Sequence, residues 1–115
     1  MADTVIYDKE QGVGIIRFRF NEINLEQREE IKEKLKSFLV SGETRFIIDL
    51  SKVGFLSSLV LALIVFFAKE VKEKSGEIKL SGLTSEAVGV FQVTQLDKIF
   101  EMYDTEKQAL ESFAE

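Results

Sequence analysis

The sequence contains no cysteine and no histidine, and these two absences exclude most kinds of catalytic site. Without cysteine there is no disulfide, no thiolate nucleophile and no cysteine-based metal site. Without histidine, the commonest general base and metal ligand is missing as well. We therefore expect a non-enzymatic protein with neither a metal nor a cofactor. The lack of cysteine also fits a cytoplasmic location.

Long hydrophobic runs and concentrated positive charge are also lacking. The longest uncharged stretch, residues 53–68, is shorter than the roughly 20 apolar residues that span a membrane, so we expect no membrane insertion. The formal net charge is −5, and the basic residues are interspersed with acidic ones. This pattern opposes nucleic-acid binding and favours a protein partner.

What is present predicts one α/β domain over residues 1–115. With 45% hydrophobic residues the chain can bury a core, and the absence of proline fits a chain without a stiff linker. Strands alternate with helices in the order β-β-α-β-α-β-α-β-α, which predicts a mixed, mostly parallel five-stranded sheet with four helices. The strands are expected at residues 5–7, 13–20, 46–48, 78–80 and 99–103, and the helices begin near Asn24, Ser57, Thr84 and Thr105.

Residues 45–69 form the stretch around which the chain is organised. The buried strand ends at Asp49 and leads through a short loop to the serines that begin a long apolar helix. Binding sites of open α/β sheets lie where strand ends meet helix N-termini, so we expect the functional site here. Asp49 either contacts a ligand or supports the loop by accepting N–H bonds.

Ser57 and Ser58 are the only polar side chains between Lys52 and Lys69. They can cap the helix, which is their simplest role. A nucleophilic serine needs a neighbouring base, and the chain has no histidine to serve as one. Phosphorylation is chemically better suited, because a dianion at a helix N-terminus meets unpaired N–H groups.

The helix after these serines has more apolar surface than attachment to a sheet requires. Leu59, Ala62, Leu63 and Phe66 fall on the same side as the charged residues of its second half. Two alternatives follow: neighbouring helices cover this side, or it is a partner or homodimer face anchored by Leu59, Leu63 and Phe66.

Two motifs resemble those of the anti-sigma factor antagonist family, whose domain is called STAS. Residues 49–58, DLSKVGFLSS, resemble the family segment D-L-S-x-V-x-F-[IM]-D-S-[ST]-G-L-G. Residues 94–105, TQLDKIFEMYDT, followed by Ala109-Leu110, resemble its C-terminal motif T-x-L-x-K-[IL]-F-x-[IV]-Y-D-[ST] and final helix. The resemblance covers nearly the whole chain and implies a STAS-like fold.

The resemblance also implies a function. Such bacterial proteins regulate transcription by partner switching: the unmodified form binds an anti-sigma factor that is also a serine kinase, and phosphorylation breaks the complex. Together with the apolar helix side described above, this leads us to expect these partner-binding residues: Gly54, Phe55, Leu56, Ser57, Ser58, Leu59, Ala62, Leu63 and Phe66. The alternatives are a self-associating assembly subunit and a small-molecule-binding subunit of a sensor or transport complex.

This sequence departs from the family motif where phosphorylation normally occurs. Aligned without gaps, the family aspartate falls on Ser57, the first serine on Ser58 and the phosphoacceptor on Leu59. The two glycines that follow fall on Val60 and Ala62. Because leucine has no hydroxyl, the usual switch is either lost, leaving an unswitched binder, or moved to Ser58.

Overall fold

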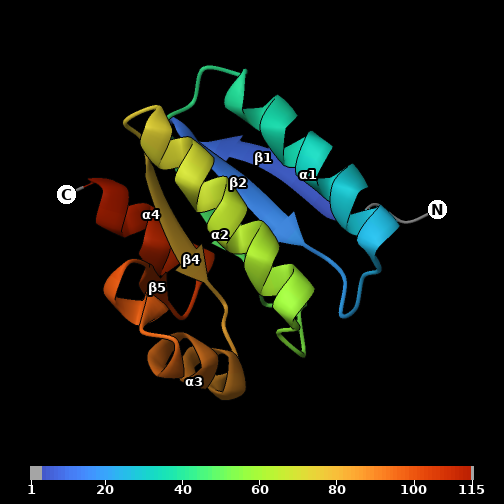
Figure 1. The fold of residues 1–115 in the computed structure, drawn as a ribbon. Helices are drawn as coiled ribbons and strands as arrows, with labels where there is room; N and C mark the ends of the chain where they lie inside the picture. The colour runs from blue at the N-terminus through green and yellow to red at the C-terminus, as the bar shows by residue number, and fades with distance from the viewer. Residues whose placement is uncertain (1–3, 115) are drawn as a thin grey trace.

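The computed structural model describes residues 4–114, and it contains the expected alternation of strands and helices (Figure 1). The strands are β1 (Val5–Glu10), β2 (Val13–Phe18), β3 (Arg45–Asp49), β4 (Glu77–Ser81) and β5 (Glu101–Tyr103). The helices are α1 (Leu25–Leu39), α2 (Ser58–Glu73), α3 (Ser85–Val93) and α4 (Glu106–Ala114), with a 3₁₀ turn over Leu96–Lys98.

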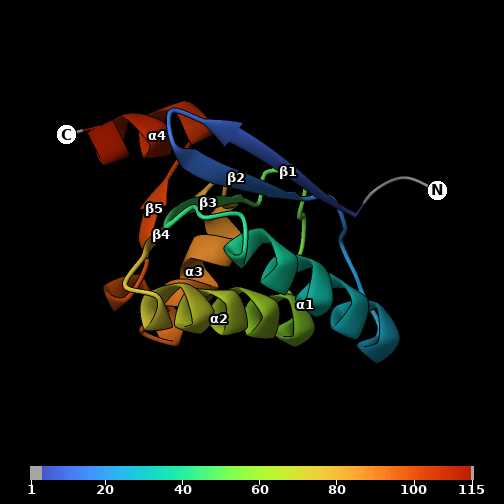
Figure 2. The same ribbon diagram turned by 90° about the horizontal axis from the view of Figure 1, so that it is seen from above.

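The sheet has the order β1-β2-β3-β4-β5, with β1 antiparallel to β2 and the remaining pairs parallel. Helices α1, α2 and α3 lie on one face and α4 lies on the other (Figure 2). The β1–β2 turn consists of Gln11 and Gly12, both with positive φ, which suits the twist of a two-residue hairpin. The predicted mixed, mostly parallel α/β sheet is therefore confirmed.

Alternation along the central strands produces two apolar cores. Ile16 and Ile48 belong to the large core beneath α1, α2 and α3. Their neighbours Ile15 and Ile47 point to the other face and form a small core with α4. The small core is completed by Val13, Ala109 and Phe113.

The predicted helix starts are confirmed by their caps. Asn24 forms a capping box with Gln27, and Ser57 and Thr84 accept the N–H groups of Val60 and Ala87. Thr105 likewise accepts the N–H of Gln108 at the start of α4.

Three predicted strand boundaries are wrong by two residues or more. The first strand continues to Glu10 instead of ending at Tyr7. The last strand begins at Glu101 instead of Ile99, because a left-handed Gln95 starts a 3₁₀ turn that buries Phe100 against Phe91. The second strand ends at Phe18, and the alternation through Phe20 continues outside the sheet.

Candidate functional site

The carboxyl ends of the four parallel strands lie at one edge of the sheet, where the loops after β2 and β3 meet. Within the loop after β3, the Val53 N–H donates to the Leu50 carbonyl at 2.9 Å. The Gly54 N–H donates to Asn21 Oδ1 at 2.7 Å, which ties this loop to the one after β2. Leu50 and Val53 are buried, whereas Phe55 is 65% exposed. The loop is thus held in place while it presents an apolar ring to solvent.

The two serines have different environments. The Ser57 Oγ accepts the Val60 N–H at 3.3 Å and is half-buried as the N-cap of α2. Ser58 is the first residue of α2 and is exposed. Leu59, at the position of the family's phosphoacceptor, is half-buried, and Val60 is fully buried. Of these four side chains, Ser58 carries the accessible hydroxyl.

Asp49 supports the loop, but through different bonds from those expected. It is buried, with Oδ2 accepting the Ser51 hydroxyl at 2.6 Å and Oδ1 accepting the Ser81 hydroxyl at 2.9 Å. Its hydrogen bonds come from side-chain hydroxyls, so the expectation of loop N–H donors is wrong. Ser81 lies on β4 and was missed, because its proximity to Asp49 depends on strand pairing.

Gly82 allows β4 to pass close to this carboxylate. Its φ is +74°, and a Cβ placed there would lie 2.8 Å from Asp49 Oδ1 and 2.8 Å from the Ser51 backbone nitrogen. The Leu50 N–H also donates to the Ser81 carbonyl at 2.8 Å. Together these contacts fix the start of the loop against β4.

The apolar side of α2 is largely covered by α1. Leu63 is only 1% exposed, so it is a core residue and not the surface anchor considered above. Phe66 is half-buried beneath Lys32, whose Nζ lies 4.6 Å from the ring centroid. Ala62 and Val65 are exposed. The sequence analysis missed Val65 because it falls between the side of the helix that faces the sheet and the side that carries Ala62 and Phe66.

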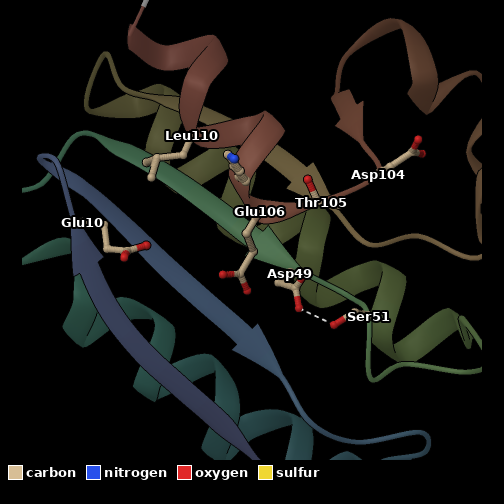
Figure 3. A pocket seen from close by; sticks show the side chains of 8 residues that line it. Glu10, Asp49, Ser51, Asp104, Thr105, Glu106 and Leu110 are labelled. Carbon is tan, nitrogen blue, oxygen red and sulfur yellow. Dashed lines mark hydrogen bonds between the residues drawn. The ribbon is translucent and has the colours of Figure 1, made fainter.

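A hollow of about 590 Å³ lies on the opposite face of the sheet beside α4 (Figure 3). Asp49 and Glu106 point toward the same space from β3 and α4 (Figure 3). Arg17 donates to both Glu106 oxygens, at 2.7 and 2.9 Å, and this hydrogen bonding raises the pKa of the Arg17 guanidinium. The lining residues are Glu10, Asp49, Ser51, Asp104, Thr105, Glu106, Lys107 and Leu110.

Between residues 4 and 114, no three acidic side chains are placed to hold a metal ion together. Over the same residues, no helix combines the length and the apolar character needed to cross a membrane.

The fold and the loop after β3 define a class of protein. Residues 4–109 match the STAS domain family, and the chain belongs to this family. The resemblance drawn from the two sequence motifs is thereby confirmed.

Individual relatives share both sequence and fold with the chain. A Thermotoga neapolitana protein, whose name places it among anti-sigma factor antagonists, is 32% identical over 78% of this chain and 80% of its own length. The anti-sigma-B factor antagonist of Listeria monocytogenes is 28% identical over 77% of this chain and 78% of its own. The crystal structure of a similarly named Thermotoga maritima protein superposes with a TM-score of 0.85 at 27% identity, covering 96% of this chain and 95% of that one.

Proposed function

We propose that this chain is a non-enzymatic regulatory protein that binds an anti-sigma factor with serine kinase activity in the bacterial cytoplasm. The docking surface is the loop 54–58 with the start of α2. Its residues are Gly54, Phe55, Leu56, Ser57, Ser58, Leu59 and Ala62. Membership of the STAS family and the names of the relatives support this class of function.

The observation that carries the proposal is the exposed ring of Phe55 on a fixed loop. The Phe55 side chain is 65% exposed, so its removal from water by a partner would lower the free energy of the complex. The Asn21–Gly54 hydrogen bond and the buried Leu50 and Val53 already order the loop, so binding loses less conformational entropy. Phe55 therefore has the properties of a binding anchor.

An affinity pull-down from the source organism's lysate tests the proposal. Wild-type protein should recover a kinase-like anti-sigma factor, and Phe55→Ser should lose it. Val40→Ser is the matched control. Val40 is also a strongly exposed apolar residue, at 82%, but it lies at the C-terminus of α1 and outside the docking surface. Equal recovery by wild type and Phe55→Ser would show that this loop is not the docking surface.

The phosphorylation switch is proposed to be lost or moved. Leu59 cannot be phosphorylated, and Ser57 already uses its oxygen to cap α2. Ser58 remains exposed at the first turn, where a phosphate would be stabilised by the helix N-terminus. Intact mass after incubation with the partner kinase and ATP should show either no phosphate or one phosphate that Ser58→Ala removes. A phosphate that persists in Ser58→Ala would contradict this assignment.

Two features favour the alternative functions. Val93 and Ile99 are 85% and 58% exposed and could pair copies of the chain, which sedimentation at increasing concentration would reveal.

The hollow beside α4 could hold a small molecule. A ligand present at 100 times its dissociation constant would then stabilise the fold by about 2.7 kcal/mol.

A further inference from the structure

A second hollow, of about 400 Å³, lies at the same edge of the sheet as the docking loop. Arg19, Phe20 and Asn21 line it from the segment after β2, and Lys52 lines it from the loop after β3. Phe20 is buried and supplies an apolar wall. The other three side chains are exposed and polar, so the chemistry of the hollow depends on them.

Donors outnumber acceptors among the polar groups that these side chains offer. Arg19 carries a guanidinium and Lys52 an ammonium group, and neither has an acceptor of its own. The Asn21 Oδ1 accepts the Gly54 N–H at 2.7 Å, and the Asn21 amide nitrogen is a further donor. Within residues 4–114, Arg19 and Lys52 form no ion pair, and no carboxylate lines the hollow.

We infer that this hollow, the Arg19–Lys52 pocket, binds a carboxylate side chain of the protein that docks on loop 54–58. A planar guanidinium can hold a carboxylate through two hydrogen bonds, while an ammonium acts as a point charge beside it. This inference rests on the proposed function, because it describes the chemistry of the same partner. Asn21 joins the two regions, since it forms one wall of the pocket and holds Gly54 in the docking loop.

The charge of the whole chain makes such a pocket selective. A net charge of −5 repels an acidic partner at long range. An acidic segment therefore binds favourably only where local cations offset that repulsion. Charge complementarity of this kind mainly sets orientation and partner choice. The pocket would therefore align an acidic segment of the partner with Phe55.

A titration with a simple probe tests the pocket without the partner. The peptide acetyl-Glu-Glu-Glu-Glu-amide is added to ¹⁵N-labelled protein at low salt, and inorganic phosphate is added to a separate sample. The peptide should shift the backbone signals of Arg19, Asn21, Lys52 and Gly54. The double variant Arg19→Gln/Lys52→Gln should bind it roughly tenfold more weakly, as expected for loss of charge-assisted hydrogen bonds.

The matched control is Lys34→Gln/Lys72→Gln, which removes two exposed lysines that lie outside the pocket and form no ion pair within residues 4–114. This variant should bind the peptide as wild type does. Equal weakening by both double variants would show nonspecific attraction and overturn the inference. Saturable shifts with phosphate and none with the peptide would overturn the assignment to a carboxylate.

Failure of this inference can be distinguished from failure of the proposed function. Phe55→Ser should lose the partner in the pull-down yet bind the peptide normally. If the lysate partner is captured equally by wild type and Arg19→Gln/Lys52→Gln, the pocket has no part in docking and the inference is wrong. If wild type captures no partner, the proposed function fails and the inference about its partner fails with it, even where the peptide still binds at the pocket.

Discussion

At the scale of single residues, Gly82 combines a positive φ with close packing against the loop after β3. Gly82 and Gly42 both have positive φ, at +74° and +96°, so alanine is strained at either position. A Cβ at Gly42 would meet open space, whereas at Gly82 it would lie 2.8 Å from Asp49 Oδ1 and from Ser51 atoms. We expect Gly42→Ala to lower the free energy of unfolding by about 1–2 kcal/mol, the cost of a left-handed residue.

Gly82→Ala should cost at least about 1 kcal/mol more than Gly42→Ala, as overpacking typically does. Urea denaturation of the two variants measures the difference. Equal losses would mean that Asp49 and Ser51 move aside freely, and the loop after β3 would then be less rigid than its hydrogen bonds indicate.

Gly89 should respond in the opposite direction. It lies inside α3, and a Cβ added there would contact nothing within 4 Å. Alanine is favoured over glycine in a helix interior by about 0.8–1 kcal/mol, because glycine loses more backbone freedom on folding. Gly89→Ala should therefore raise the free energy of unfolding by close to this amount in the same urea experiment. A loss of stability would show that α3 needs the glycine for a backbone distortion.

At the scale of elements, α4 packs into a smaller apolar core than α2 does. It covers a small core of five buried residues, whereas α2 packs into the large core on the other face. Polar contacts add to its attachment: Arg17 binds Glu106, and the buried Lys79 donates to Ser112 at 2.7 Å with its Nζ 4.2 Å from the Phe113 ring centroid. Elements with few apolar contacts open at lower free energy than the core.

Hydrogen exchange should show this difference between helices. Amides of α4 are expected to exchange faster than those of α2, and Glu106→Gln should lower the opening free energy of α4 by about 1 kcal/mol by weakening its bonds to Arg17. Glu33→Gln is the control, because Glu33 pairs with Lys36 at 3.6 Å on the exposed face of α1 and should have little effect. Uniform protection across α2 and α4 would contradict the prediction.

Elements and their caps were predictable from sequence, whereas the contacts between elements were not. Hydrophobic period and capping residues are local, so α1, α2 and α3 begin where Asn24, Ser57 and Thr84 indicated. The burial of Leu63 depends on α1 lying against α2, which a helical wheel cannot show. The bond between Asp49 and Ser81 likewise depends on the pairing of β3 with β4.

The same distinction applies to the candidate site. Loop 54–58 was located from sequence because strand ends and helix starts are local signals. The Arg19–Lys52 pocket was not, because its residues come from two loops that meet only when β2 and β3 pair. The hollow beside α4 was missed for a similar reason, since β1, β3 and α4 all contribute to it.

At the scale of the whole molecule, one sheet separates two cores that share its central strands. Ile15 and Ile16 are adjacent on β2 yet belong to different cores, and the same is true of Ile47 and Ile48 on β3. Loss of β2 or β3 would therefore remove both cores together. This arrangement predicts a single cooperative unfolding transition, even though α4 opens locally at lower free energy.

The two tyrosines can report on the two cores separately. Tyr7 packs against the large core, Tyr103 packs against the small one, and the chain has no tryptophan to mask their fluorescence. In Tyr103→Phe the signal comes from Tyr7 alone, and in Tyr7→Phe from Tyr103 alone. If the shared strands couple the cores, each variant's tyrosine transition in urea should have the same midpoint as its own far-UV circular dichroism. A Tyr103 transition that clearly preceded the circular dichroism would instead show that the α4 side unfolds as a separate unit.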